Sequence, residues 1–233
     1  MKVIPAQQPF TQLSVFFGGM YFIPGDPDFD PTTPWTDKRV RQAMNMALNR
    51  DDLNQFILQG QGEIQHVTAC CHPVLAPEVY NPQWAEDWEE MYGYNPEKAK
   101  QLLAEAGYGP DNPVKVTLYN YRTSGEPEAP LIIEALPQYW GPIGIEATIQ
   151  DIDTGAVTRL WREKKMQHAV WAKVFSFRPI QERVRTNHSQ HSSSHYFDHP
   201  FVDQKYEEML STSSQEEVNR IGREVADFWY DNY

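Results

Sequence analysis

The middle of the chain alternates strand and helix patterns, and this alternation constrains the fold more than any other feature. Val114, Val116 and Leu118 alternate with polar side chains, which is the pattern of a strand with one buried face. An amphipathic helix follows over about 128–140, and a second alternation occupies 145–150. Short connections between strand, helix and strand predict a parallel crossover.

The alternation continues with one more helix and one more strand. Val157, Leu160 and Trp161 have the three- and four-residue spacing of a helix that lies on a core. The run from His168 to Phe175 has the length and composition of a buried strand. The middle of the chain therefore predicts a βαβαβ unit, which places the protein in the α/β class.

The same patterns predict which faces of these elements are buried. We expect Pro137 to kink the first helix, because proline removes a backbone hydrogen bond from a helix interior. The side chains expected to face the core are Leu131, Ala135, Tyr139, Ile145, Ala147 and Ile149.

A pair of amphipathic helices precedes this unit. Their expected apolar stripes are Val40, Ala43, Met44, Ala47 and Leu48 in the first helix and Leu53, Phe56 and Ile57 in the second. Thr36 or Asp37 has a side-chain oxygen that can cap the first helix. Asp51 or Asp52 can cap the second, which is expected to end at Gly60.

Other elements are predicted from shorter signals. Residues 12–17 (QLSVFF) predict a strand, and Asn95-Pro96 is a strong helix start because asparagine caps well and proline suits the first helical position. Further helices are expected over about 84–91, 95–106, 200–210 and 214–228, and a polar loop over 178–194.

Composition and charge narrow the functional class. The 233 residues include 40% hydrophobic and 13% aromatic residues, which is enough for a sizeable core. The formal net charge of −12 repels phosphate backbones and anionic membranes, so nucleic acid is not an expected partner. No apolar run reaches the length of about 18 residues that a membrane-spanning helix needs.

The sequence contains none of the common enzyme motifs. The patterns G-x-S-x-G, H-E-x-x-H, G-x-G-x-x-G, G-x-x-x-x-G-K-(S/T) and C-x-x-C do not occur, so we expect no enzymatic activity and no cofactor. The adjacent Cys70 and Cys71 are expected to be reduced thiols in a loop, with a strained vicinal disulfide as the alternative.

Four segments, in chain order, carry a resemblance to a known family. They are DKRVRQAMNMALNRDDL from Asp37, YNPEKAKQLLAEAGY from Tyr94, YWGPIGIEATIQ from Tyr139, and the tail that begins HYFDHP at His195. Together they resemble the family 5 extracellular solute-binding proteins of ABC transporters, the oligopeptide- and dipeptide-binding type. The resemblance implies a periplasmic-binding-protein-like (class II) C-terminal lobe with a βαβαβ sheet core and flanking helices.

The resemblance also implies a domain organisation and a cellular role. Residues 1–35 would form a strand and loop near the hinge, and 36–233 a single ligand-binding lobe of a larger two-lobe protein. Such a protein captures a small solute, without chemistry, at the periplasmic or extracellular face of the membrane and delivers it to an ABC transporter permease. The signal peptide and first lobe would lie outside this fragment, and only a lipid anchor or the permease would connect the parent protein to the membrane.

Candidate contacts to the solute follow from the predicted strand ends, where open α/β sheets bind ligands. They are Asn120, Tyr121, Arg122, Trp171, Lys173, Phe175, Phe177 and Arg178. Aromatic faces stack on solutes, and Arg and Lys pair with anions. Tyr121 and Trp171 are equally compatible with a role as core aromatics. An interaction domain without a small ligand would instead present a flat surface at Trp171 and Arg178.

One position departs from the peptide-binding members of the family. Those proteins carry a G-W-x-x-D-Y-like segment whose aspartate pairs with the α-amino group of the peptide. Aligning Trp171 with the tryptophan of that segment places Val174 at the aspartate position. Loss of one partner of a desolvated charge pair costs about 2–5 kcal/mol, so peptides become less favoured than oligosaccharides or other small organic solutes.

Four histidines within twelve residues suggest a second possible site. His188, His191, His195 and His199 can in principle bind zinc, nickel or copper. Their spacing does not follow a helix, and a polar loop with separately solvated imidazoles is the favoured interpretation. The alternative function is therefore a metal-binding module or metal-dependent enzyme that uses the 188–199 loop.

Overall fold

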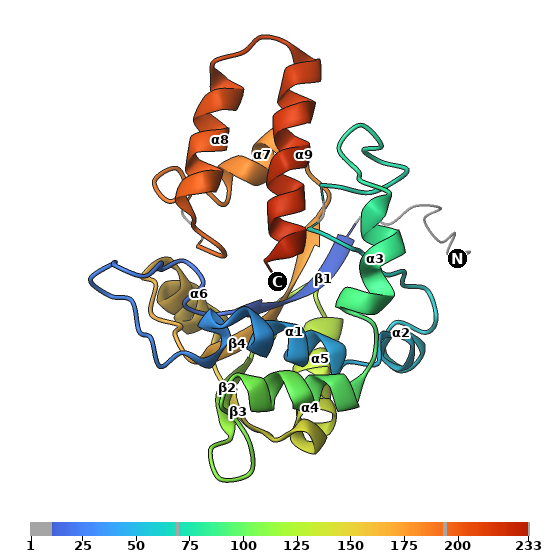
Figure 1. Ribbon diagram of the computed structural model, residues 1–233, viewed down its shortest axis with the longest axis vertical. Coiled ribbons are helices and arrows are strands. Elements are labelled where there is room, and N and C mark those ends of the chain that lie inside the picture. Colours follow the sequence, from blue (N-terminus) through green and yellow to red (C-terminus); the bar gives the residue numbers. More distant parts are fainter. Residues whose placement is uncertain (1–10, 69, 193–194, 233) are drawn as a thin grey trace.

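The computed structural model describes residues 11–68, 70–192 and 195–232, and its centre is a four-stranded mixed sheet (Figure 1). The strands are β1 (Thr11–Phe17), β2 (Val114–Asn120), β3 (Ile145–Asp151) and β4 (Ala169–Ser176), in the spatial order β1-β4-β2-β3. β2 runs parallel to both β3 and β4, and β1 runs antiparallel to β4. The predicted α/β fold and its parallel strands are confirmed.

Helices and two 3-10 turns surround the sheet. The α-helices are α1 (Lys38–Met46), α2 (Arg50–Ile57), α3 (Gln83–Met91), α4 (Pro96–Glu105), α5 (Glu128–Trp140), α6 (Thr154–Arg162), α7 (Ile180–Arg185), α8 (Pro200–Leu210) and α9 (Gln215–Asp231). The turns are η1 (Pro34–Thr36) and η2 (Gly141–Ile143). Among the described residues, no helix combines the length and the apolar character needed to cross a bilayer.

The first core lies between the sheet and helices α1, α4 and α5. The stripe predicted for α1 is buried at all of its positions, Val40, Ala43, Met44, Ala47 and Leu48. Asp37 caps this helix, since its side chain accepts the backbone N–H of Arg39 at 2.8 Å. Asn95 caps α4 by accepting the N–H of Lys98. Local sequence signals therefore place both helices correctly.

The inward face predicted for α5 is wrong in part. Leu131 is 47% exposed, and Ala135 and Tyr139 are only half-buried. The buried apolar side chains of this helix are Ala129, Ile132, Ile133, Leu136 and Trp140. Apolar residues occupy most of the circumference of α5, so spacing alone does not select a face. The Trp140 indole N–H donates to the Met44 carbonyl at 3.0 Å, which fixes the rotation of α5 against α1.

Two further predictions fail at the edges of this unit. Ile149 is 40% exposed because β3 is the outermost strand of the sheet. Phe56 is 80% exposed, and α2 has no fully buried side chain. The N-cap of α2 is Asn49, which accepts the N–H of Asp52, rather than either of the two predicted aspartates.

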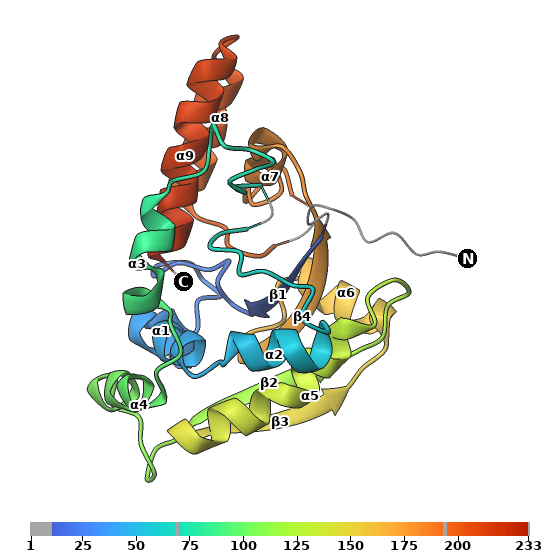
Figure 2. The same ribbon diagram turned by 90° about the vertical axis from the view of Figure 1, so that its right-hand side faces the viewer.

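The second core packs α3 and the segment before it against α7, α8 and α9, and α8 and α9 lie side by side at one end of the molecule (Figures 1 and 2). The predicted helices at 84–91, 200–210 and 214–228 are confirmed. The loop predicted for 178–194 is wrong at 180–185, which form α7. Ile180 and Val184, one turn apart, are buried in this core.

Close packing explains why α7 forms. Gly222 of α9 lies against Ile180, and a Cβ added there would lie 2.5 Å from the Ile180 side chain. Only glycine allows this approach, so the two helices bury apolar surface that a loop would leave exposed.

Within the segment 1–35 that is predicted to lie near a hinge, Thr11–Phe17 form β1 of the same sheet. β1 pairs with β4 along its whole length, from Thr11 opposite Ser176 to Phe17 opposite Val170. The strand therefore presents its other edge outward, and that edge borders the candidate site.

Candidate solute-binding site

A cavity of about 460 Å³ is lined by residues of β1, of the α1–α2 pair and the segment that follows it, and of the C-terminal half. Its wall includes side chains from segments far apart in sequence. Among them are Ser14, Phe16, Arg41, Phe175, Arg183 and Tyr196. The cavity joins the two cores, because Leu13 and Val15 of the first and Trp88 of the second also line it.

Three aromatic rings form one part of this wall. The ring centroid of Phe16 lies 5.2 Å from that of Phe175 and 4.9 Å from that of Tyr196. Phe175 and Tyr196 are 5.1 Å apart and meet edge to face. Tyr196 also packs on Trp161 at 4.5 Å. A cluster of this kind supplies a rigid apolar surface against which a solute can pack.

Two cations lie against Phe175. The guanidinium of Arg183 is 5.1 Å from the ring centroid, and the Lys173 ammonium is 6.0 Å from it. Lys173 also forms an ion pair with Glu126 at 3.7 Å. The Glu126 carboxylate accepts the backbone N–H of Val174 at 3.2 Å, so it holds the end of β4 to the loop after β2.

The predicted residues after β2 lie at the carboxyl end of the sheet, outside the cavity wall. Asn120 is buried and donates to Asp151 at 3.1 Å and Glu134 at 3.3 Å. The Tyr121 hydroxyl donates to the Ala172 carbonyl at 2.9 Å, and burial raises its pKa. Arg122 is exposed.

The predicted residues along and beyond β4 divide between core and surface. Trp171 is 1% exposed and packs on Phe16 at 5.7 Å, which favours a core role on this lobe. Phe177 is half-buried against the second core, and Arg178 is exposed and pairs with Glu182 at 2.9 Å. Of the predicted contact residues, all of them described by the structure, Phe175 alone lines the cavity.

Phe16, Arg183 and Tyr196 are among the cavity residues that sequence reasoning missed. Arg183 falls in the segment predicted as a loop, and the spacing of Ile180 and Val184 was the available signal for a helix there. Phe16 is on a predicted strand, but its neighbours come from β4 and from residue 196, and no local pattern identifies such partners.

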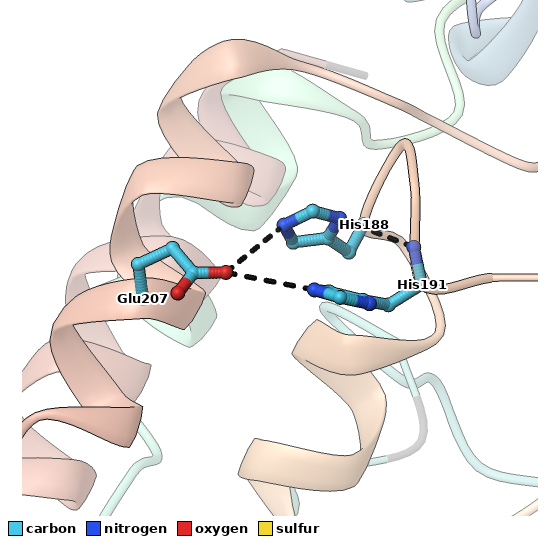
Figure 3. A group of neighbouring side chains, drawn as sticks. All are labelled: His188, His191 and Glu207. Atoms are coloured by element: carbon cyan, nitrogen blue, oxygen red, sulfur yellow. Dashed lines mark hydrogen bonds and ion pairs between the residues drawn. The ribbon is translucent and has the colours of Figure 1, made fainter.

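Of the four clustered histidines, only two come together (Figure 3). The Nε2 atoms of His188 and His191 each lie 3.6 Å from the Glu207 carboxylate. His188 Nδ1 accepts backbone N–H groups from Gln190 at 3.0 Å and from His191 at 3.3 Å. The proton of the neutral His188 ring therefore lies on Nε2, the atom that faces the carboxylate.

This protonation does not suit metal binding. A metal-bound imidazole nitrogen needs a free lone pair, and its other nitrogen usually donates a hydrogen bond rather than accepting two. The other two histidines have different partners: His195 bonds Asp198 at 2.7 Å, and His199 caps α8 by accepting the N–H of Phe201. The metal-binding alternative is therefore not favoured.

Both cysteines are free and buried in the second core. Burial raises the pKa of the Cys71 thiol well above its usual range. No disulfide joins the two sulfur atoms, which lie 2.8 Å apart, and the reduced state of the pair stays a prediction.

The sheet order and the helical cover have the fold of the class II periplasmic-binding-protein type. Residues 8–193 match the family model described as "Bacterial extracellular solute-binding proteins, family 5 Middle". The chain belongs to this family.

Named relatives include binding proteins for different solutes. The chain is 29% identical over 147 residues to heme-binding protein A of Haemophilus influenzae, covering 62% of this chain and 24% of that protein. It is 29% identical over 137 residues to the dipeptide-binding protein of Escherichia coli, covering 58% and 23%. The match therefore spans about a quarter of the length of these relatives.

Solved structures show the same fold. The oligopeptide-binding protein AppA of Bacillus subtilis, in complex with a nonapeptide, matches with a TM-score of 0.69 at 18% identity, covering 96% of this chain and 43% of that one. NikA of Staphylococcus aureus, in complex with Ni(L-His)2, matches with a TM-score of 0.65 at 19% identity, covering 97% and 46%.

Proposed function

We propose that this lobe captures a small solute, together with a second lobe, for import by an ABC transporter permease. The observation that carries the proposal is the cavity beside β1, which combines aromatic walls with arginine side chains in a member of family 5. Binding sites for small molecules are concave and mostly apolar, with a few placed polar groups, and this cavity has that character.

The proposal is a binding role without chemistry, at the periplasmic or extracellular face of the membrane. Relatives of this chain are named as binding proteins, which supports the absence of catalysis. We also propose that residues before 36 lie next to the hinge between lobes, and that closure of the lobes encloses the solute.

We further propose that Lys173, Phe175 and Arg178 contact the solute. Phe175 lines the cavity. Lys173 and Arg178 carry cationic groups near the carboxyl end of β4. Asn120, Tyr121, Arg122, Trp171 and Phe177 complete the proposed set, with Tyr121 and Trp171 acting through the packing of their neighbours.

The solute need not carry a free ammonium group. Position 174 holds a valine, and the carboxylate that contacts it, that of Glu126, is already engaged by Lys173 and by the Val174 N–H. An ammonium placed there would have to displace the lysine. This favours organic solutes whose recognition rests on apolar surface and on groups other than an ammonium.

The test is thermal unfolding of the 233-residue chain with short peptides, amino acids, oligosaccharides, nickel and zinc, with EDTA as a control. A solute that binds only the folded chain stabilises it by about 2.7 kcal/mol at a hundredfold excess over its dissociation constant. We expect an organic solute to raise the midpoint.

Two matched variants locate the binding. Ser14→Phe fills the cavity from β1, whereas Thr11→Phe places the same ring at an exposed position of the same strand. We expect the first to abolish the shift and the second to retain it. A shift with metal alone that EDTA reverses, or no shift with any solute, would contradict the proposal.

A further inference from the structure

The cavity wall carries positive charge in an acidic protein. Arg41, Arg50 and Arg183 all line it, although the chain has a formal net charge of −12. Within the described residues, none of the three lies within 4.0 Å of a carboxylate oxygen in an ion pair. The acids of the wall are Asp51 and Glu63, and Glu63 is paired with His72 at 2.6 Å.

Two of the arginines have structural roles. Arg41 donates to the carbonyls of Trp35, Thr36 and Asn232, and so joins α1 to the end of α9. Arg50 donates to the Asn45 carbonyl and side-chain oxygen and to the Tyr92 carbonyl. Burial lowers the pKa of each to about 10. Each of the two guanidinium groups therefore makes three hydrogen bonds to acceptors within the protein.

Arg183 differs from Arg41 and Arg50 in how few of its side-chain donors have an acceptor in the protein. It is 4% exposed, and within the described structure its guanidinium makes one hydrogen bond, from Nη2 to the Ser176 carbonyl at 2.9 Å. Its Nε is buried without a hydrogen-bond partner in that same part of the chain. Burial lowers its pKa, and the neighbouring groups that affect the pKa are Cys70, Tyr196, Cys71 and Arg178. None of these neighbours is a carboxylate.

A buried guanidinium without a counter-charge is costly, and proteins rarely keep one without a partner. The fold nevertheless holds Arg183 against Phe175, in the wall of a cavity that can admit a small molecule. Arg is the side chain best suited to bind a carboxylate through two parallel hydrogen bonds.

We infer that the cavity takes a carboxylate-bearing solute and that Arg183 pairs with the carboxylate. The inference rests on the proposed function and names the chemical class of its solute. The rings of Phe16, Phe175 and Tyr196 next to Arg183 favour an apolar or aromatic body attached to the anionic group.

The test compares two probes that differ in charge and barely in size, N-acetyl-phenylalanine and its amide. Calorimetric titration of the chain at neutral pH, where the carboxylate is ionised, gives both affinities. We expect the acid to bind about tenfold more tightly or better, since a hydrogen bond to a charged group contributes about 1.5–3 kcal/mol and about 1.4 kcal/mol is tenfold.

Three variants separate a role in binding from a structural role. Arg183→Met should remove the preference for the acid and leave the ligand-free chain at least as stable in urea, because it removes an unpaired buried charge. Arg183→Gln keeps a donor for the Ser176 carbonyl and should also lose the preference. Arg185→Gln, on the same helix but outside the cavity wall and paired with Glu182, should retain it.

The possible outcomes distinguish this inference from the proposed function. Equal affinities for acid and amide, or a preference that survives Arg183→Met, would overturn the inference while leaving solute capture intact. A chain that binds neither probe and no solute of the wider panel would overturn the proposed function itself. A less stable ligand-free Arg183→Met protein, with the preference retained in Arg183→Gln, would assign Arg183 a structural role.

Discussion

Two cations lie against the ring of Phe175, and they differ in whether a carboxylate neutralises their charge. At the strand ends, Lys173 is paired with Glu126, and the same carboxylate bonds the backbone of Val174. In the cavity wall, Arg183 has no carboxylate partner among the described residues. The first arrangement is complete within the lobe. The charge of Arg183 is left for the carboxylate of the inferred solute to neutralise.

The difference between the two cations distinguishes a charge that stabilises the fold from a charge that can bind a solute. Pairing is expected for charges that hold the fold together, because desolvation makes an unpaired charge expensive. A buried charge that the fold leaves unpaired beside a cavity is therefore more informative than an exposed one. On this criterion Arg183 is a stronger candidate than the exposed Arg122 or Arg178.

The largest expected effect tests whether the strand-end region is core. Trp171→Ala should lower the free energy of unfolding by about 3–5 kcal/mol, because it removes a large side chain that is 1% exposed. Urea denaturation measures the change. Phe56→Ala, at an 80% exposed position, should change stability by no more than about 0.5 kcal/mol. If Trp171→Ala lowers the free energy of unfolding by less than about 1 kcal/mol, Trp171 is not a core residue and direct contact with the solute becomes the better interpretation.

The next effect tests the pairing at the strand ends. Glu126→Gln should destabilise the chain by about 1–2 kcal/mol, since the side chains of Glu126 and Lys173 are only 15% and 25% exposed. The control is Glu146→Gln, whose partner Lys115 is 76% exposed, and it should have almost no effect. Similar results for the two variants in urea would remove the distinction between the regions.

A smaller effect tests the contact between Phe175 and Arg183. A double-mutant cycle with Phe175→Leu and Arg183→Met should give a coupling energy of about 1 kcal/mol, from the attraction between a desolvated guanidinium and an aromatic face. The same cycle with Lys173→Met should give less, because its ammonium is farther from the ring and already paired. A coupling of zero at Arg183 would mean that the ring does not stabilise this charge.

The smallest effect concerns a paired group outside both regions. Hydrogen bonds from Thr32 and then His168 lower the pKa of Asp30 from 3.8 to about 2. Because the pKa is lower in the folded chain than in the unfolded one, the stabilisation is present above about pH 4 and is lost as the pH falls to about 2. Melting temperatures across this range should fall more steeply for the native chain than for Asp30→Asn. Parallel curves would exclude the contribution.

Local patterns predicted most of the fold because the signals lie within a few residues of one another. The stripe of α1, the cap at Asn95 and the alternation of β2 are all read from short stretches. The predictions that failed depended on distant partners. Leu131 was assigned inward because an apolar helix offers several faces, and α7 was assigned to a loop because its stability comes from packing on α9.

The candidate site was less predictable than the fold. Phe175 was identified from its place on a strand, whereas Arg183 and Phe16 reach the same cavity from α7 and β1. Whether a charged side chain is paired is a property of its three-dimensional surroundings. The sequence contains Lys173 and Arg183 as two ordinary cations, ten residues apart.

The sequence by itself determined the α/β class, the order of the elements and the family resemblance, because these depend on residue spacing along the chain. The tertiary structure alone decided which strand lies beside which helix, where the two cores leave a cavity, and which of its arginines keeps a buried nitrogen without an acceptor. Burial and pairing arise only when residues distant in sequence are packed together, and they turn one of several arginines into a candidate binding group.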